Sequence, residues 1–187
     1  MAAKKSEALR VHGIDMNSVP DTVLPDLLML GLRLVICGSA AGTASAAKGA
    51  YYAGPGNKFW PILAETGLTP RLLRPEEFGL LPGFGVGLTD LAKHASGPDT
   101  AIKRRDYDAA GLAARIRACR PGILAFNGKR AAATFLGRQV GFGAQPDLPD
   151  FPPIFVLPST SGLASGHWEP AHWHRLAACV LRPELLP

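Results

Sequence analysis

The sequence predicts an α/β protein: a three-layer α/β/α sandwich around a mainly four-stranded parallel sheet. Four short apolar runs, at 32–37, 85–91, 122–126 and 153–157, have the length and composition of buried strands. Helical patterns separate them, and strands that alternate with helices at this spacing form parallel sheets covered on both faces. The chain has 187 residues, 47% of them hydrophobic, which suits one compact domain with a sizeable core.

Helices are expected between and around these strands. The first has an apolar face over 19–30, and the polar stretch before it predicts a leader at 1–17 followed by a single domain at 18–187. The polar stretch 93–105 is expected to be a loop. The other helical patterns cover 57–65, 74–81, 108–119, 128–136 and 169–181.

Composition and charge exclude several classes of protein. Lys and Arg number 20 and Asp and Glu 15, a net charge of +5, and the apolar content excludes a disordered chain. The longest apolar run, 27–34, is far shorter than the roughly 20 residues of a membrane span. The N-terminus has no apolar stretch of the signal-peptide type. We therefore expect a cytoplasmic protein with no membrane partner.

The cysteines and histidines give no sign of a metal or cofactor. Cys37, Cys119 and Cys179 are odd in number and dispersed, so neither a disulfide framework nor a zinc or iron–sulfur site is indicated. His172 and His174 would point away from each other on a helix. We expect three buried thiols, no metal and no cofactor.

Three loops are expected to meet in one cleft. Ligands of open parallel sheets bind beyond the carboxyl ends of the strands, which places the loops after Cys37, Thr89 and Leu157 together. The first loop, 38–56, opens with the small residues Gly-Ser-Ala-Ala-Gly, whose backbone can approach a ligand closely. A dinucleotide-binding turn would need G-x-G-x-x-G opening a helix directly, and the spacing here differs.

Two of these loops carry a large apolar residue among small ones. Tyr52 lies before a Gly/Pro turn, where it is either a core aromatic or a ring that stacks on a planar ligand. Asn57, after that turn, is a possible helix cap. Leu163 lies at the tip of loop 158–166, where it either folds back onto the core or acts as a wedge between stacked bases.

Five motifs in order resemble those of the uracil-DNA glycosylase superfamily, over about 32–180, and are closest to its mismatch-specific uracil/thymine DNA glycosylases. The family's Gly-Ile-Asn-Pro-Gly corresponds to 38–42, and its aromatic-Ala-His-Pro-x-Asn-Arg-Phe-Trp corresponds to Tyr-Ala-Gly-Pro-Gly-Asn-Lys-Phe-Trp at 52–60. The other three are Gly-Leu-Thr-Asp at 87–90, Phe-Asn-Gly-Lys at 126–129 and Leu-Pro-Ser-Thr-Ser-Gly-Leu at 157–163.

The resemblance implies a uracil-DNA glycosylase-like fold and a monofunctional DNA glycosylase. Such enzymes of base excision repair flip uracil out of DNA and hydrolyse its N-glycosidic bond, which leaves an abasic site. The expected partner is uracil-containing, double-stranded DNA, bound by a monomer that is associated with the nucleoid if the source is bacterial. The net positive charge suits phosphate contact. Neither a metal nor a lyase lysine is required.

The resemblance also implies roles for individual residues. Tyr52 stacks on the base, backbone amides near Ser39 and Tyr52 hold its carbonyl oxygens, and residues 162–164 fill the gap left in the duplex. The substrate-binding residues are then Gly38, Ser39, Ala40, Tyr52, Asn57 and Asn127. The DNA-binding residues are Ser159, Ser161, Gly162, Leu163 and Ala164.

The first motif departs from the family pattern at one position. The family's Asn, which positions or activates water, is replaced by Ala40, whose methyl group can do neither. Asp90 is the first candidate for a replacement, because a carboxylate at a strand end could orient the water and stabilise positive charge on the sugar. Alternatively, Asp90 accepts the N3–H of uracil or caps the turn after Thr89. His167 is the second catalytic candidate, with DNA contact or a helix cap as its other interpretations.

Ala40 also leaves alternative functions open. A non-catalytic module that binds uracil or abasic sites in DNA would need no group to activate water. An enzyme that binds free nucleosides would keep the cleft but show no salt-sensitive DNA affinity. The iron–sulfur branches of the superfamily carry Ala in the first motif, but they need four cysteines and this chain has three.

Overall fold

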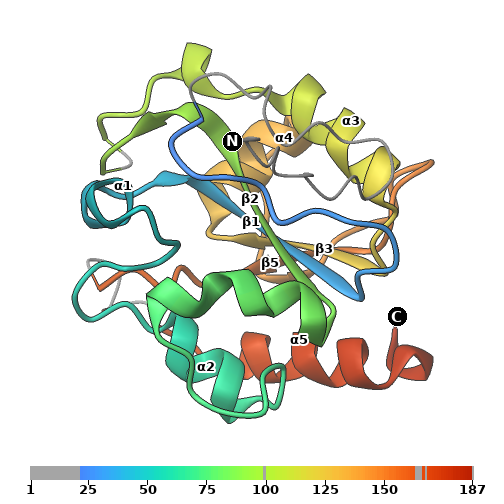
Figure 1. Cartoon of the computed structure of the whole chain (residues 1–187). Coiled ribbons are helices and arrows are strands. Elements are labelled where there is room, and N and C mark those ends of the chain that lie inside the picture. The colour runs from blue at the N-terminus through green and yellow to red at the C-terminus, as the bar shows by residue number, and fades with distance from the viewer. Residues whose placement is uncertain (1–21, 99, 163–165, 167, 187) are drawn as a thin grey trace, which may run out of the picture.

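A mixed sheet forms the middle layer of the protein (Figure 1). The computed structural model describes residues 22–98, 100–162, 166 and 168–186, and in this part of the chain the sheet has five strands in the order β2-β1-β3-β5-β4. Strands β2, β1, β3 and β5 are parallel, and β4 pairs antiparallel with β5. The strands are β1 (Leu34–Ala41), β2 (Val86–Ser96), β3 (Ile123–Asn127), β4 (Gly143–Ala144) and β5 (Ile154–Leu157).

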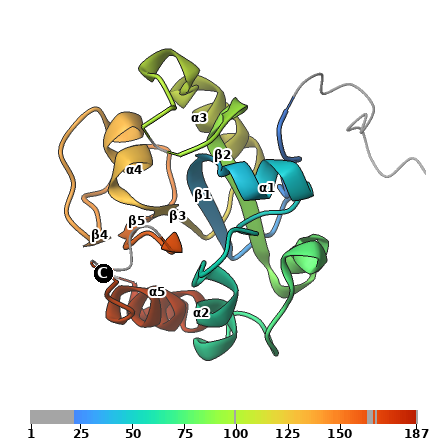
Figure 2. The same cartoon turned by 90° about the vertical axis from the view of Figure 1, so that its left-hand side faces the viewer.

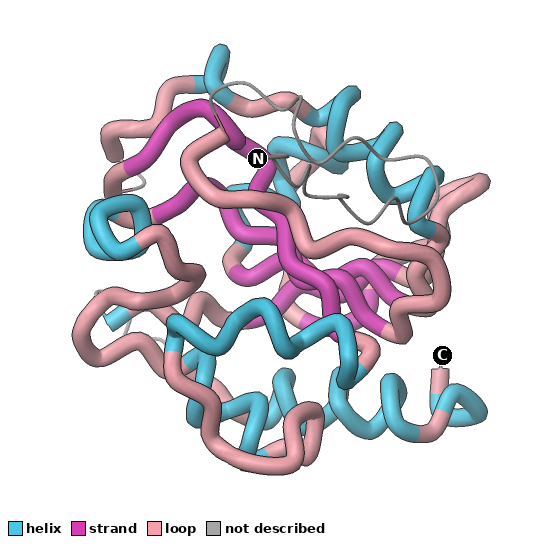
Figure 3. Tube along the Cα trace, in the orientation of Figure 1, coloured by secondary structure: helices cyan, strands magenta, loops and turns pink. Residues whose placement is uncertain are grey.

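Helices cover both faces of the sheet, as Figures 2 and 3 show. The alternation of side chains along β1 explains why two apolar layers form: Leu34 and Ile36 belong to one buried cluster, Val35 and Cys37 to the other. Helices α2 and α5 and the 3₁₀ segment pack on the first face, α3 and α4 on the second. The helices are α1 (Thr43–Lys48), α2 (Phe59–Glu65), the 3₁₀ segment Pro75–Phe84, α3 (Ala109–Cys119), α4 (Lys129–Leu136) and α5 (Ala171–Leu181).

The prediction of a helix over 19–30 is wrong for residues 22–30, the part of this range that the structure describes. Residues 22–28 form an extended strap along β2: the amide of Val23 donates to the carbonyl of Lys93 at 2.8 Å, and Leu27 and Leu88 bond to each other in an antiparallel bridge. β2 is the edge strand of the sheet, and its outer backbone groups would have no partner without the strap. Satisfying these groups outweighs the local helical pattern.

The loop predicted over 93–105 begins too early. β2 runs on to Ser96, because β1 also extends to Ala41 and pairs with it through an irregularity after Ala40. In the first loop, 38–56, the chain additionally forms the short helix α1. The predicted leader, 1–17, lies outside the described residues. None of the described helices has the length and apolar character needed to cross a bilayer.

Candidate active site

Asp90, Gly38 and Tyr52 converge at the carboxyl ends of β1 and β2. The parallel register places Asp90 directly opposite Gly38. A Cβ on Gly38 would collide with Oδ1 of Asp90 and would lie 3.4 Å from the hydroxyl of Tyr52. The absence of a side chain at Gly38 therefore lets both polar groups approach the end of β1. Asp90 itself is only 4% exposed.

Tyr52 is held in an unusual backbone conformation. Its φ angle is +53°, in the left-handed region that non-glycine residues rarely adopt and that is enriched at functional sites. The ring stacks on Phe59, with 3.8 Å between ring centroids and 22° between planes. Ser45 helps to fix this turn, because its Oγ accepts a hydrogen bond from the amide of Ala53 at 3.1 Å.

The hydroxyl of Tyr52 is buried and has no hydrogen-bond partner of good geometry among the described residues. Burial raises the pKa of this phenol far above its ordinary value, and Asp90 raises it further, while the nearby side chain of Asn127 opposes the shift. The Tyr52 phenol therefore keeps its proton, and the hydroxyl lies next to the end of β1 at Gly38.

Burial also determines the charge of Asp90. It raises the pKa of the Asp90 carboxyl to about 7; Lys93 and Arg115 act against this shift and Asp26 adds to it. Near neutral pH the carboxyl is consequently divided between its charged and neutral forms. A carboxylate with such a pKa is suited to take up a proton during a reaction.

Charged side chains from the strap, β2 and α3 form a cluster next to Asp90. Lys93 Nζ lies 2.6 Å from Asp26 Oδ1 in the strap, and Asp26 Oδ2 lies 3.2 Å from Arg115 Nε on α3. Arg115 Nη2 donates to the backbone carbonyl of Asp90 at 3.1 Å. Sequence reasoning missed all three residues. The signal that could have found them is a charge within an apolar stretch, as for Asp26 in 23–30.

The two asparagines of the predicted site are engaged in local structure. Asn127 Nδ2 donates to Thr160 Oγ1 at 2.8 Å, and its Oδ1 accepts from the Thr160 amide at 3.0 Å. Asn127 thus ties the end of β3 to the loop after β5. Asn57 Oδ1 accepts from the amide of Phe59 at 3.0 Å in the turn before α2, but the N-cap residue of that helix is Lys58 and not Asn57.

The loop after β5 lies against the loop that carries Tyr52. The amide of Lys58 donates to the carbonyl of Thr160 at 2.9 Å, and a Cβ on Gly162 would lie 2.8 Å from the carbonyl oxygen of Pro55. Ser159 Oγ accepts from the amide of Ser161 at 3.3 Å. The structure thus brings part of the predicted DNA-binding set beside the predicted substrate-binding set. Leu163, Ala164 and His167 lie outside the described residues.

The end of β1 supplies little polar chemistry of its own from side chains. Ser39 and Ala40 are half-buried, and Ala40 lies opposite Ala92 in the register with β2. The carboxylate at this end of the sheet is that of Asp90, which pairs directly with Gly38 across β1 and β2. Among the described residues, no three His, Cys, Asp or Glu side chains gather as a metal-binding group would require.

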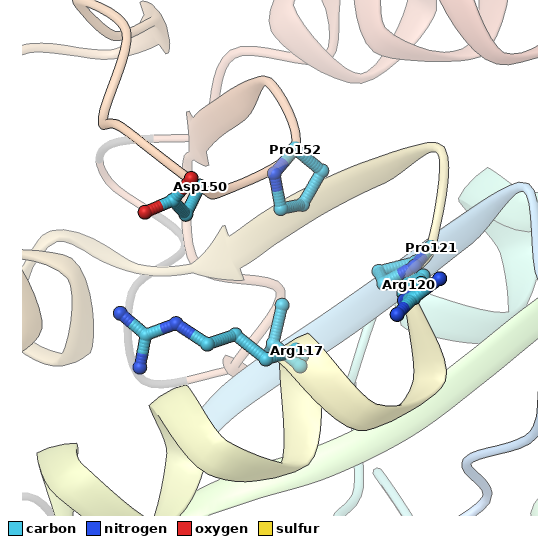
Figure 4. A pocket seen from close by; sticks show the side chains of 6 residues that line it. Arg117, Arg120, Pro121, Asp150 and Pro152 are labelled. Atoms are coloured by element: carbon cyan, nitrogen blue, oxygen red, sulfur yellow. The ribbon is translucent and has the colours of Figure 1, made fainter.

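A hollow of about 430 Å³ lies at the opposite end of the sheet (Figure 4). Pro121 and Pro152 on its wall precede the first residues of β3 and β5, whereas Asp90 lies at the carboxyl ends of the strands. Ligands of such sheets bind at the carboxyl ends, so this hollow is separate from the candidate site. Its lining consists of Ile116, Arg117, Arg120, Pro121, Asp150 and Pro152.

Two comparisons with known proteins identify the fold and the family of this chain. The solution NMR structure of a candidate uracil DNA glycosylase from Methanosarcina acetivorans is similar, with a TM-score of 0.59 and 22% identity over 85% of this chain and 97% of that chain. This likeness confirms the predicted three-layer fold. The family model of the Uracil DNA glycosylase superfamily matches residues 25–179, most of the chain, and supports a glycosylase-type function. The protein therefore belongs to the uracil DNA glycosylase superfamily.

Proposed function

We propose that this protein is a monofunctional DNA glycosylase that flips uracil out of double-stranded DNA and hydrolyses its N-glycosidic bond. One observation carries the proposal: the buried carboxyl of Asp90 lies beside Gly38 and the Tyr52 hydroxyl, at the strand end where Ala40 offers no polar group. In this account Asp90 takes over the role of the asparagine that the first motif lacks.

The reaction begins with the break of the bond between C1′ and N1. Its electron pair leaves with the base, which gives a uracil anion and an oxocarbenium-like sugar. Water then adds at C1′ and gives its proton to the carboxylate of Asp90, which leaves an abasic site. The anion, held at its carbonyl oxygens by backbone amides near Ser39 and Tyr52, takes a proton from solvent and leaves as uracil. The Asp90 carboxyl releases the proton of the attacking water to solvent, which restores the carboxylate.

Tyr52 and the loop after β5 hold the substrate in this account. Phe59 covers one face of the Tyr52 ring, and the flipped base stacks against the opposite face. Ser159, Ser161 and Gly162 lie beside the loop of Tyr52, a position suited to contact with the phosphates around the flipped nucleotide. Leu163 and Ala164 fill the gap in the duplex, and His167 contacts DNA or assists the reaction.

The alternative is a non-catalytic protein that binds uracil or abasic sites in DNA. Ala40 favours it, because the residue that positions water in the family's first motif is missing here. The two functions differ in the fate of the glycosidic bond, since both predict a tight complex with uracil-containing DNA.

The test uses a labelled duplex with one U·G pair, incubated with the wild type and with Asp90→Asn. Alkali-labile cleavage by the wild type that collapses in Asp90→Asn supports the proposal. Cleavage that persists unchanged in Asp90→Asn contradicts the role of Asp90. A shifted band with no cleavage identifies a DNA-binding protein. Tight binding of free nucleoside, with no salt-sensitive affinity for DNA, would point to a nucleoside-binding enzyme.

A further inference from the structure

The strap formed by residues 22–28 delivers one carboxylate to the back of the candidate site. Asp26 accepts a hydrogen bond from the hydroxyl of Thr89 at 2.7 Å, next to Asp90 in the chain. The strap is fixed at both sides of Asp26: Lys93 Nζ donates to the carbonyl of Leu24 at 2.7 Å, and Leu27 bonds to Leu88. Asp26 therefore has a defined position relative to β2.

Asp26 holds two cations from different elements. Lys93 on β2 is 6% exposed, and its ammonium group lies 2.6 Å from Asp26. Arg115 on α3 pairs with the other carboxylate oxygen of Asp26 and also donates to the carbonyl of Asp90. A buried charge is costly unless it is paired, which explains why Lys93 and Arg115 both turn toward Asp26.

The charges around Asp90 are balanced by this arrangement. Removing Asp26 alone would leave two cations near one carboxyl, and removing Lys93 alone would leave two carboxyls near one guanidinium. Removal of Asp26 should therefore lower the pKa of the Asp90 carboxyl, and removal of Lys93 should raise it. The titratable groups that face Asp90 are Cys37 from β1, Tyr51 and Tyr52 from the loop after α1, Lys93 from β2, Arg115 from α3 and Asp26 from the strap.

We propose that Asp26 is a positioning residue for Asp90: it holds Arg115 against the Asp90 backbone and, by pairing with Lys93 and Arg115, limits their attraction for the Asp90 carboxyl. The proposal rests on the proposed glycosylase function for its effect on catalysis. Its structural part, the control of Asp90 through the strap, can be measured without any catalytic activity.

The experiment compares Asp26→Asn, Lys93→Met and the double variant with the wild type. Single-turnover excision of uracil is followed from pH 5 to 9, and DNA affinity is measured separately. We expect Asp26→Asn to shift the rising limb of the rate to lower pH and Lys93→Met to shift it to higher pH, each by roughly half a unit to one unit. The double variant removes one charge of each sign and should return toward the wild type.

A merely structural role predicts a different result. It would lower the melting temperature and the amount of active protein, but the rising limb of the excision rate would stay at the same pH. We expect the rate of Asp26→Asn to fall by roughly 10-fold to 100-fold, with DNA affinity little changed, because Asp90 loses its alignment. Glu77→Gln is the matched control: it breaks the exposed ion pair with Arg71, 2.8 Å long, and should not move the limb.

A stability measurement separates this proposal from the proposed function. The gain in melting temperature on Asp90→Asn is recorded against pH, with and without Asp26→Asn. This gain grows between the unfolded-state and the folded-state pKa of Asp90, so its midpoint moves whenever the folded-state pKa moves. A midpoint that moves to lower pH in the Asp26→Asn background supports the proposal even if the protein excises no base. An unmoved midpoint overturns it even if excision is fast. If Asp26→Asn does not fold, Lys93→Met decides, with a shift to higher pH in support and none against.

Discussion

The carboxyl group of Asp90 occupies the space that a side chain on Gly38 would need. The two residues face each other across the pairing of β1 and β2, and Oδ1 of Asp90 is the first atom that a Cβ on Gly38 would meet. The glycine that opens the first motif is therefore required by its neighbour on β2, and the position of the carboxyl depends on it.

Gly38→Ala should displace Asp90 and slow uracil excision by roughly 10-fold to 100-fold, since small misplacements of a reacting group are costly. The added methyl group should also cost about 1–3 kcal/mol of stability through overpacking. Single-turnover rates and thermal melts measure the two effects. In the control, Gly79→Ala, the new Cβ has no neighbour within 4 Å and the rate should not change. A wild-type rate in Gly38→Ala would contradict the placement of Asp90.

Tyr52 offers a ring and a hydroxyl that can be separated by mutation. Tyr52→Ala should lose roughly 1–3 kcal/mol of DNA binding, as for other aromatic–base stacks. Tyr52→Phe keeps the stack on Phe59, so DNA binding should persist. It also removes the buried hydroxyl that lies beside Gly38, so the rate of excision should fall. Phe151→Ala, near the far end of the sheet, is the control for ring removal. Unchanged binding and rate in Tyr52→Ala would exclude Tyr52 from the site.

Asp90→Asn should stabilise the protein more at pH 8 than at pH 5. The folded state raises the pKa of this carboxyl from 3.8 to about 7, so the stability of the wild type decreases as the pH rises through that interval. Asparagine carries no charge at either pH and avoids the buried carboxylate. Thermal melts at both values measure the difference, with the exposed Asp147→Asn as the control. An equal effect at pH 5 and pH 8 would show that Asp90 does not titrate in this range.

Leu163 tests the proposed insertion into the duplex. Leu163→Ala should impair excision from double-stranded DNA more than from single-stranded DNA, because only the duplex leaves a gap to fill. Leu80→Ala, an exposed leucine on the 3₁₀ segment, should affect neither substrate. Equal losses on both substrates would mean that Leu163 only packs its own loop.

Much of the fold follows from local pattern. The strands and the helix α3 lie close to their predicted positions, because alternation along β1 and the spacing of Leu112, Ile116 and Cys119 reflect burial directly. Asp90 could be placed near the first loop because the carboxyl ends of neighbouring parallel strands meet at one edge of the sheet.

The charged cluster behind Asp90 depends on distant partners and could not be predicted. Asp26 lies in a stretch with a helical pattern, but the free edge of β2 draws that stretch into an extended strap. Lys93 begins a polar stretch that is typical of a loop, and it is buried because Asp26, 67 positions earlier, neutralises it. The sequence predicts Asn127 as a substrate-binding residue but does not indicate its hydrogen bonds to Thr160. These bonds form because the loop after β5 lies beside the end of β3 in the folded chain.

The pH dependence of the chemical step tests the central claim most directly. We would measure single-turnover excision of uracil from a U·G duplex between pH 5 and 9, for the wild type and Asp90→Asn. If the Asp90 carboxylate receives the proton of the attacking water, the wild-type rate rises with pH and levels off above an apparent pKa of about 7, and Asp90→Asn loses this limb and most of the rate. A limb of the same shape and height in Asp90→Asn would contradict the account.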